Sequence, residues 1–140
     1  MLFCVDSPLN LTMGLFGSLF GSKETKGNNE LPWIQLTAIE QLAEIRERSK
    51  EKPQIIFKHS TTCGISRMVI GMFTDDYPFN ENTADLYYLD LHAYREVSNE
   101  VGIAFQVLHQ SPQLLVIKNG ETVFHTSHGA ITEVDLEQFG

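Results

Sequence analysis

The sequence predicts an α/β fold in which a mixed central sheet lies between two layers of helices. Strand-like and helix-like segments alternate from Trp33 to Gly102, which is typical of parallel strands joined by helical crossovers. The segment 114–125 then has two apolar runs around Asn119-Gly120, a strong hairpin signal that adds antiparallel strands to the sheet. The predicted order of elements is β-α-β-α-β-α-β-β-α.

The first strand and the first helix are predicted within residues 34–52. Residues 34–36 form a short strand, and Thr37 begins a capping box, in which its hydroxyl accepts from the third helical amide while Glu40 reaches back. A polar stretch rich in Arg and Lys ends this helix ahead of Pro53. The side chains that we expect to point inward are Ile39, Leu42 and Ile45.

The next elements are a strand over residues 54–58, apolar enough to be buried on both faces, and a helix that opens after Cys63. A third strand covers residues 85–91, the helix after it ends at Gly102, and a closing helix begins at Thr132. Apolar residues recur in the helix after Cys63 at i, i+3, i+4, i+7 and i+8, which predicts one buried face. They are Ile65, Met68, Val69, Met72 and Phe73.

The composition excludes several classes of protein. With 140 residues and 15.8 kDa, the chain fits one domain with a real core. The formal charge of -8 and the pI near 5.0 leave no basic surplus for phosphates, so we expect no nucleic acid partner and no anionic membrane surface. No apolar run approaches the roughly 18 residues of a spanning helix, and we therefore expect no membrane span.

Cysteine usage indicates a reducing compartment. The chain has two cysteines, Cys4 and Cys63, too few for a disulfide-stapled secreted scaffold. The first 22 residues contain no Lys or Arg and include Asp6, so they lack the positive n-region of a secretory signal. We expect the protein in the cytoplasm, acting as a monomer.

Residues 1–32 are rich in Gly, Ser and Asn and have no sustained period. We interpret them as a flexible tail and residues 33–140 as the folded domain. Met13 is a second candidate for the true start of the chain. Gly14 and Ser18 have the spacing of a myristoylation signal once Met13 is removed, and the nearby apolar side chains could dock on a partner or membrane. We prefer the interpretation of a tail without either function.

Cys63 is the residue that indicates chemistry, because it lies at the junction of a buried strand and an amphipathic helix. A cysteine in the first turn of a helix meets free amides and the positive end of the helix dipole. Helix N-termini and nearby cations lower the pKa of a thiol from about 8.5 to roughly 3.5–7.5. Arg67 lies on the same helix face, and no acidic residue occurs from Lys58 to Arg67. We therefore predict a reactive thiolate rather than a buried, inert cysteine.

Ser66 stands where a dithiol oxidoreductase has its second cysteine, so the motif is Cys-x-x-Ser. A hydroxyl at this position could hydrogen-bond the thiolate but cannot form a disulfide. A mixed disulfide on Cys63 must therefore be resolved by a thiol of another molecule.

The C-terminal half of the domain resembles thioredoxins. The resemblance rests on the run Ser-Pro-Gln-Leu-Leu-Val-Ile-Lys-Asn-Gly-Glu at residues 111–121 and on Gly129-Ala130. In that family the proline is cis and packs beside the active cysteine, and the extended backbone before it binds substrate chains. The resemblance therefore implies a thioredoxin-like fold with Ser111 and Pro112 in the site.

From about residue 33 to residue 140, the chain most closely resembles the YtxJ-like monothiol bacilliredoxins of the bacillithiol system. Their Thr-Cys-Pro-Ile-Ser motif matches residues 62–66 except at Gly64, where glycine, unlike proline, does not preset the first helical turn. The resemblance implies that Cys63 removes bacillithiol, a low-molecular-weight thiol that acts as co-substrate, from proteins that carry it as a mixed disulfide. It implies no tightly bound cofactor.

The predicted site combines catalytic residues with groups that hold the substrate. Cys63 is the nucleophile, and Ser66 is its hydrogen-bonding neighbour. Lys58 and Arg67 are expected to supply positive charge for the malate carboxylates of bacillithiol, and the site includes no metal ligand. The predicted substrate-binding residues are Thr62, Gly64, Ile65, Arg67, Lys58, Ser111 and Pro112.

The main alternative is a monothiol glutaredoxin, which uses glutathione and bridges an iron–sulfur cluster between two subunits. Cys-Gly-Ile-Ser at residues 63–66 resembles its motif, but the Gly-Gly-x-Asp that holds glutathione after the hairpin is replaced by Thr-Ser-His-Gly at 126–129. A peroxiredoxin is disfavoured because Ile56 occupies the position of its motif proline. A binding module without enzymatic activity stays open as a further alternative.

The histidines raise the question of a metal site. His125 and His128 lie at a strand end with no second pair of ligands nearby in the sequence, whereas structural zinc sites show tighter Cys/His spacing. We interpret the histidines as surface or core-edge residues. His59 is the exception, because a histidinium near Cys63 would favour the thiolate.

Overall fold

The computed structural model describes residues 31–140, whose compact part is the unit Pro32–Gly140. The interpretations that concern residues 1–30, including the candidate start at Met13 and the docking or lipidation of the tail, lie outside the described residues.

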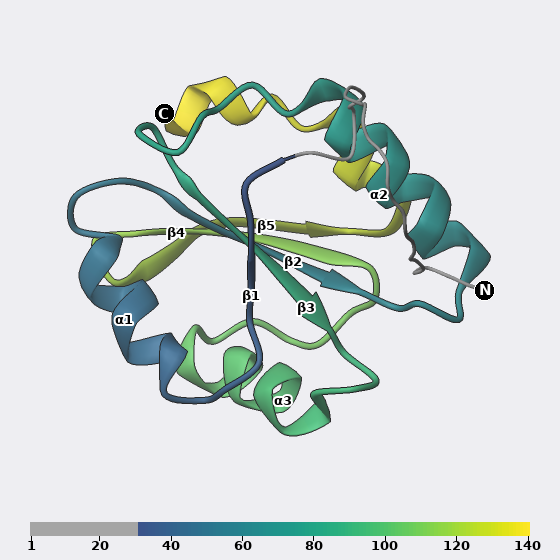
Figure 1. Cartoon of the computed structure of the whole chain (residues 1–140), viewed down its shortest axis with the longest axis horizontal. Coiled ribbons are helices and arrows are strands. Elements are labelled where there is room, and N and C mark those ends of the chain that lie inside the picture. Colours follow the sequence, from purple (N-terminus) through teal and green to yellow (C-terminus); the bar gives the residue numbers. More distant parts are fainter. Residues whose placement is uncertain (1–30) are drawn as a thin grey trace, which may run out of the picture. The chain divides into compact units, whose positions relative to one another are not determined.

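In residues 31–140, a five-stranded mixed sheet forms the centre of the domain (Figure 1). Its strand order is β1-β3-β2-β4-β5, with β1, β3 and β2 parallel to one another and with β4 and β5 each antiparallel to the strand before it in that order. The predicted mixed sheet is therefore confirmed. The strands are β1 (Trp33–Gln35), β2 (Gln54–His59), β3 (Asp85–Asp90), β4 (Gln113–Lys118) and β5 (Glu121–Ser127).

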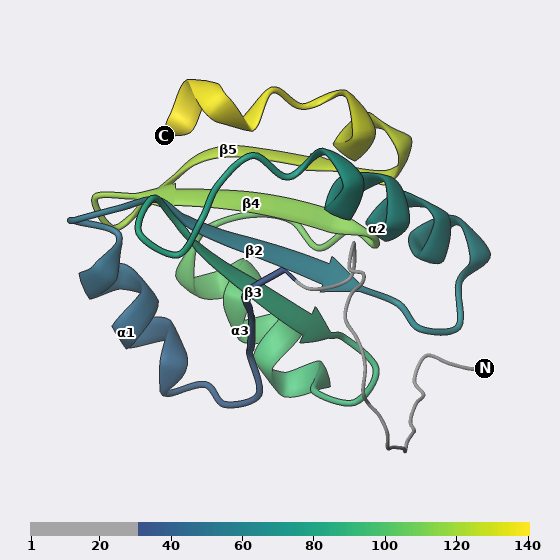
Figure 2. The same ribbon diagram turned by 45° about the horizontal axis from the view of Figure 1, so that its top comes forward.

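Helices cover both faces of this sheet, in the three layers that the sequence predicts. Helices α1 and α3 lie on one face, and α2 lies on the other face together with two 3-10 helices near the C-terminus (Figures 1 and 2). The α-helices are α1 (Gln41–Arg48), α2 (Gly64–Asp76) and α3 (Arg95–Ala104), and the 3-10 helices are His128–Glu133 and Leu136–Phe139.

Each face of the sheet has its own core, and β2 contributes to both. Successive side chains of a strand point to opposite faces. Ile56 and Lys58 accordingly point toward α1 and α3, where Ile56 joins the main apolar cluster. Phe57 and His59 point toward α2, and the Phe57 ring lies 5.1 Å from the ring of Phe73 between centroids. The strand that leads to Cys63 is therefore anchored in both layers.

The predicted capping box at Thr37 is wrong. Instead, the side-chain Oε1 of Gln41 accepts hydrogen bonds from the amides of Thr37 and of the following residue, at 2.8 and 2.9 Å. Ile39, expected to point inward, is 41% exposed, whereas Leu42 and Ile45 are buried as predicted. The helix begins at Gln41, later than its sequence signal indicates, and the side chain of this first helical residue accepts from the amides of the preceding turn.

Two later helices also differ from the prediction. Helix α3 continues to Ala104 instead of ending at Gly102. A Cβ at Gly102 would come within 2.9 Å of the Val107 carbonyl oxygen, so this glycine permits a close approach of the returning chain rather than ending the helix. The closing α-helix predicted from Thr132 is replaced by the two 3-10 helices, the second of which is capped by the Asp135 carboxylate.

The predicted hairpin is confirmed. Strands β4 and β5 pair antiparallel around Asn119 and Gly120, whose φ angles are 53° and 82°. Two successive residues in this left-handed region are typical of the tight turn that the Asn-Gly pair predicts.

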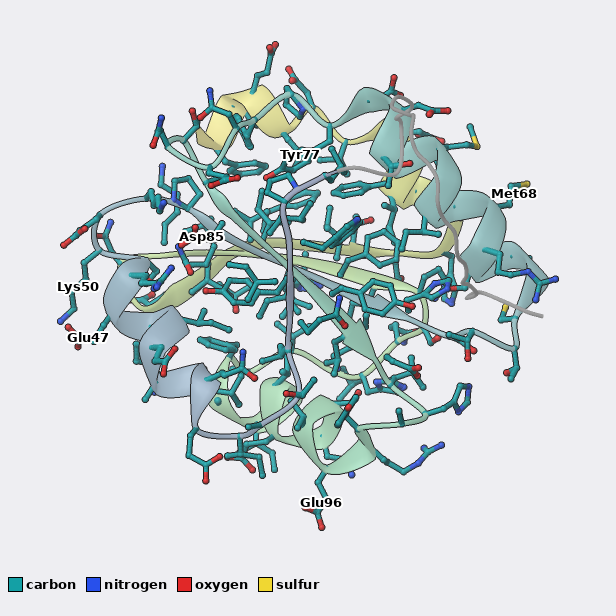
Figure 3. All side chains as sticks on the ribbon, in the orientation of Figure 1. Glu47, Lys50, Met68, Tyr77, Asp85 and Glu96 are labelled. Carbon is teal, nitrogen blue, oxygen red and sulfur yellow. The ribbon has the colours of Figure 1, made fainter. Side chains whose placement is uncertain are left out.

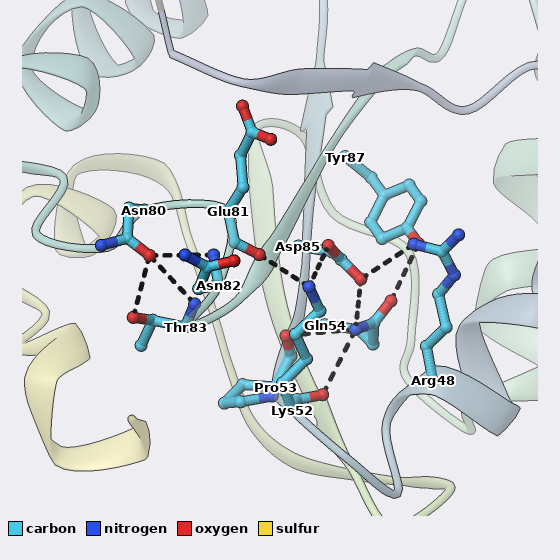
Figure 4. Close-up of polar contacts among 10 residues, drawn as sticks. All are labelled: Arg48, Lys52, Pro53, Gln54, Asn80, Glu81, Asn82, Thr83, Asp85 and Tyr87. Carbon is cyan, nitrogen blue, oxygen red and sulfur yellow. Dashed lines mark hydrogen bonds and ion pairs between the residues drawn. The ribbon is translucent and has the colours of Figure 1, made fainter.

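A buried polar network joins the amino-terminal ends of β2 and β3 (Figure 4). The Asp85 carboxylate is 7% exposed, accepts from Gln54 Nε2 at 2.9 Å, and pairs with Arg48 at 3.2 Å and Lys52 at 3.1 Å. The Tyr87 hydroxyl donates to Gln54 Oε1 at 2.8 Å. Burial alone would raise the pKa of Asp85, but hydrogen bonds from Gln54, Lys52 and Arg48 together hold it below its usual value. The network therefore ties α1 to both strands.

We expect Asp85→Asn to lower the free energy of unfolding by about 2 kcal/mol at pH 7, because it removes a charge-assisted hydrogen bond to buried Gln54 and weakens two partly exposed ion pairs. The folded-state pKa of Asp85 lies below the usual 3.8. The stabilisation is therefore present above about pH 4 and is lost as the pH falls through the folded-state value. Urea unfolding of both proteins at pH 7, and again below about pH 4, measures this difference in the free energy of unfolding.

The matched control for this variant is Glu47→Gln, which makes the same chemical change in the exposed Glu47–Lys50 pair. It should cost less than about 0.5 kcal/mol. Equal losses in the two variants would show that the buried network around Asp85 contributes no more than a surface pair.

Candidate functional site

Cys63 lies where β2 has ended and α2 begins. It is the N-cap residue of α2, with extended backbone (φ -103°, ψ 122°), one position before the first turn where the sequence places it. Its amide donates to the Ser60 carbonyl at 3.2 Å, and its carbonyl accepts from the Arg67 amide at 3.1 Å. The cysteine is free and half-buried, and the first turn of α2 has no acidic residue. The positive end of a helix thus lies beside a free thiol, an arrangement that favours an anion.

Ser66 fixes the loop that leads to the cysteine. The serine is fully buried, and its Oγ accepts from the Ser60 amide at 3.1 Å and lies 2.8 Å from His59 Nδ1. Within residues 31–140, Ser66 makes no hydrogen bond to Cys63. Burial lowers the pKa of His59 to about 4, so the ring is neutral near pH 7 and supplies no positive charge beside the thiol.

Lys58 does not supply charge beside Cys63, and this part of the predicted site is wrong. Its side chain is fully buried toward α3, where Nζ donates to the Ser98 carbonyl at 3.1 Å and to His109 Nδ1 at 3.3 Å. Burial lowers the pKa of Lys58 to about 8. The physical reason for the error is strand alternation, because Lys58 and His59 point to opposite faces of the sheet and α2 covers only the face of His59.

Ser111 and Pro112 lie at the same end of the sheet as Cys63. Strand β4 runs antiparallel beside β2, and continuing its register by one residue places Pro112 opposite His59. The Ser111–Pro112 peptide bond is cis, as the resemblance implies. Pro112 is buried and Ser111 is half-buried. The structure therefore brings the loop before β4 next to the segment that leads to the cysteine.

Thr62, Gly64 and Arg67 surround Cys63 at the surface, and all three are exposed. The Arg67 guanidinium donates to the Thr61 carbonyl at 3.4 Å, so it lies over the loop before the cysteine. A Cβ at Gly64 would meet no atom within 4 Å, and the extended backbone of Cys63 is the conformation that proline favours in the residue before it. The proline of the resembling motif would therefore fit here, and glycine changes stiffness rather than shape.

The apolar face of α2 divides into a buried part and an exposed part. Val69 and Phe73 are buried as predicted, but Ile65, Met68 and Met72 are 56%, 58% and 47% exposed. Figure 3 shows the Met68 side chain projecting from α2 away from the sheet. The helix is therefore rotated relative to the prediction, and residues 65, 68 and 72 form an exposed apolar stripe that begins beside the cysteine, called here the α2 stripe.

His92 belongs to this neighbourhood, although its sequence context does not mark it. Its Nε2 lies 2.9 Å from Ser60 Oγ and 3.3 Å from Thr62 Oγ1. The residue follows β3, the parallel neighbour of β2. Because parallel strands end at the same edge of a sheet, and ligand sites gather at that edge, the position of His92 after a predicted parallel strand is the signal that could have found it.

Within residues 31–140, no three His, Cys, Asp or Glu side chains gather into a group that could hold a metal ion. The helices of the same range include none that is long and apolar enough to cross a membrane.

Solved structures with the same architecture include an oxidoreductase and thioredoxins. One that is 33% identical and described as an oxidoreductase with a thioredoxin fold matches with a TM-score of 0.65, over 76% of this chain and 92% of that one. The reduced thioredoxin pre-protein of Schistosoma mansoni matches at 21% identity, TM-score 0.59, 77% and 98% coverage. Thioredoxin O2 of Arabidopsis thaliana matches at 18% identity, TM-score 0.57, 78% and 96% coverage. The two thioredoxins show the fold, and it is the predicted thioredoxin-like fold.

A family model identifies the group within this fold. Residues 34–136, well over half of the chain, match the model of the monothiol bacilliredoxin BrxC. Together with the oxidoreductase that is 33% identical, and with a free cysteine at the start of α2, this match makes the protein a thiol oxidoreductase. The chain belongs to the monothiol bacilliredoxin family.

Proposed function

We propose that the protein removes bacillithiol from protein mixed disulfides by transferring it to Cys63. One observation supports this most strongly: the family match includes a free, half-buried cysteine at the N-cap of α2, with serine in place of a second cysteine. Bacillithiol is then a co-substrate rather than a bound cofactor. The partners are proteins that carry bacillithiol on a cysteine.

In the proposed reaction, the Cys63 thiolate attacks the bacillithiol sulfur of the mixed disulfide. A new S–S bond forms between Cys63 and bacillithiol as the bond to the substrate sulfur breaks, and the departing substrate thiolate takes a proton from water. The number of disulfide bonds is unchanged. A thiol of a second molecule then attacks the adduct, which releases bacillithiol and restores Cys63, because Ser66 offers no sulfur for this step.

The surface around Cys63 suits a protein substrate. The α2 stripe exposes three large apolar side chains in succession from the cysteine, and contiguous apolar surface of this kind is a common sign of a protein partner. Two of the three are methionines, whose flexible side chains adapt to different partners. The loop of Ser111 and Pro112 lies at the same end of the sheet and provides a second boundary for the substrate chain.

We place this activity in the cytoplasm, with the protein acting as a monomer. Exchange through a single free thiol needs a compartment that keeps thiols reduced, and disulfides are rare there for the same reason. Of the two cations that the sequence predicts for the site, Arg67 is exposed and Lys58 is buried, so we assign the local positive charge to Arg67.

The test uses one model protein that carries either bacillithiol or glutathione on its cysteine. The reduced enzyme should gain the mass of one bacillithiol on Cys63, because a lone thiol can accept the group but cannot eject it internally. We expect the glutathione substrate to react about tenfold more slowly, the worth of one hydrogen bond to a charged group, since the Gly-Gly-x-Asp cradle is absent. Intact mass spectrometry over time measures both rates.

A faster reaction with the glutathione substrate would contradict the proposal. So would a purified dimer with iron–sulfur absorbance, because this is the behaviour expected of the monothiol glutaredoxin alternative.

A further inference from the structure

The carboxyl ends of β2 and β3 lie side by side, with His59 opposite Asp90. From there the chain continues from β2 into α2 on one face of the sheet and from β3 toward α3 on the other (Figures 1 and 2). In open α/β sheets, ligands bind where two neighbouring parallel strands send their connections to opposite faces. Cys63 lies on one side of this position, and the loop 91–94 with the first turn of α3 lies on the other.

Hydrogen bonds of His92 join the two sides. Its Nε2 contacts Ser60 Oγ at 2.9 Å and Thr62 Oγ1 at 3.3 Å, and the residue after Thr62 is the cysteine. The His92 amide in turn donates to Asp90 Oδ1 at 3.1 Å. The ring is therefore held over the loop that leads to the thiol, and two hydroxyls lie beside it.

Arg95 adds positive charge to this group. Its Nη2 lies 3.4 Å from His92 Nδ1, and because a guanidinium only donates, Nδ1 is the acceptor, which leaves Nε2 as the ring nitrogen that can donate to the two hydroxyls. Arg95 is exposed, and no carboxylate in residues 31–140 pairs with it. The neighbouring acid, Glu96, projects from α3 away from the sheet (Figure 3), and the Asp90 carboxylate accepts from two loop amides.

We infer that Arg95, which His92 holds in position, forms with the Thr62 hydroxyl a carboxylate subsite for the small thiol that is bound to Cys63. The path from Cys63 to Arg95 runs through the adjacent Thr62, one hydrogen bond, the His92 ring and a second contact. This path limits the separation between the guanidinium and the thiol to roughly 10–15 Å. A small thiol whose carboxylate lies that far from its own sulfur can therefore reach Arg95.

The proposed function supplies the occupant, and the inference rests on it for that identity. Bacillithiol carries its malyl dicarboxylate at the far end of a cysteinyl-glucosaminyl spacer, on the order of 10 Å from its sulfur when extended. The planar guanidinium of arginine matches a carboxylate with two donors. The subsite therefore recognises the malyl group while the sulfur is held in the disulfide.

The test is an exchange equilibrium, which an accessible thiol reaches whether or not it acts on protein substrates. The full chain with Cys4→Ser, so that only Cys63 reacts, is equilibrated with reduced and oxidised bacillithiol, or with the same thiol lacking the malyl group. In each case the Cys63 thiolate attacks the symmetrical disulfide, one S–S bond forms as one breaks, and one small thiolate leaves. Intact mass gives the amount of adduct.

Arg95→Gln should lower the preference for the malyl-bearing thiol about fivefold, the upper end of the range for an exposed charge pair. Lys50→Gln is the matched control, because it removes one exposed positive charge on the opposite side of the domain from Met68 (Figure 3), and it should leave the preference unchanged.

An unchanged preference in Arg95→Gln would overturn the subsite. The same loss in Lys50→Gln, or a loss in Arg67→Gln but not in Arg95→Gln, would overturn it too. Failure of the enzyme to take bacillithiol from protein substrates would instead overturn the proposed function alone, because the equilibrium contains no protein substrate.

Discussion

Cys63→Ser is expected to lower the rate of disulfide exchange by on the order of a thousandfold or more, because a serine hydroxyl is not ionised near neutral pH and cannot act as the sulfur nucleophile. The fold should remain intact. Cys63 is the N-cap of α2 and makes no side-chain cap hydrogen bond, whereas serine is a favoured N-cap residue. The loss of adduct formation is measured by intact mass, and the retained fold by circular dichroism and thermal unfolding.

The matched control is Cys4→Ser, which removes the second of the two cysteines of the chain. It should exchange at the unaltered rate. A loss of activity in Cys4→Ser would show that a second thiol takes part, and exchange that persists in Cys63→Ser would remove Cys63 from the mechanism. Full cellular function of Cys63→Ser would favour a binding module over an enzyme.

Lys58→Met is expected to change the pH dependence of stability strongly, because it removes a buried amine. Burial lowers the pKa of Lys58 from 10.5 to about 8 in the folded protein. Between these values the unfolded chain binds a proton that the folded protein does not, so the stability of the unaltered protein rises with pH across this window. The rise in the free energy of unfolding across this window is on the order of 3 kcal/mol. Below about pH 8 the cost of the buried charge is present in full, and methionine removes it.

The free energy of unfolding of Lys58→Met, relative to the unaltered protein, should therefore be highest below pH 8 and should fall by about 3 kcal/mol by pH 10.5. Urea unfolding at half-unit steps of pH measures the difference. Lys50→Met is the control at an exposed position and should give a difference that stays flat over the same range. A flat difference for Lys58→Met as well would mean that Lys58 is not held in a costly environment.

The same variant probes the loop before β4. Lys58 donates to His109, three residues before Pro112, so loss of this hydrogen bond should loosen the loop at the edge of the site. Disulfide exchange by Lys58→Met should therefore be slower at pH 7 than exchange by the unaltered protein, although the variant is the more stable of the two at that pH. The reason is that the hydrogen bond to His109 is absent at every pH.

The elements that the sequence predicts well are those specified by local signals. The run at residues 54–58 is apolar enough to identify a strand buried on both faces, and Asn119-Gly120 identifies the hairpin. The position of Cys63 between a strand and an amphipathic helix also follows from local pattern, to within one residue. Each of these features depends on the side chains of a few consecutive residues.

The errors at the site concern the direction in which side chains point rather than the position of the residues in the sequence. Lys58 is close to Cys63 in the sequence, and proximity alone suggests a shared site, but strand alternation turns it toward α3. His59 points the right way, yet burial leaves it neutral. Ile65 and Met68 fit an inward helical face by spacing, and only the rotation of α2 on the sheet decides that they are exposed.

His92 and Arg95 could be placed only from the pairing of two strands, and not from the residues around them. They lie near the loop of the cysteine only because β3 is the parallel neighbour of β2. The residues of the two loops do not specify this order of strands. The contacts of His92 with Ser60 and Thr62, and that of Arg95 with His92, depend on that pairing.

Ser66, which is hydrogen-bonded to His59 and to the Ser60 amide, determines the kinetic order of the step that releases the adduct. A second thiol in the same chain reacts at an effective concentration far above that of any thiol free in solution. With a hydroxyl in its place, release of the adduct is bimolecular, and its rate is proportional to the concentration of the external thiol. A tenfold fall in that thiol therefore slows release about tenfold and leaves capture unchanged, so the protein accumulates in its loaded form whenever free thiol is scarce.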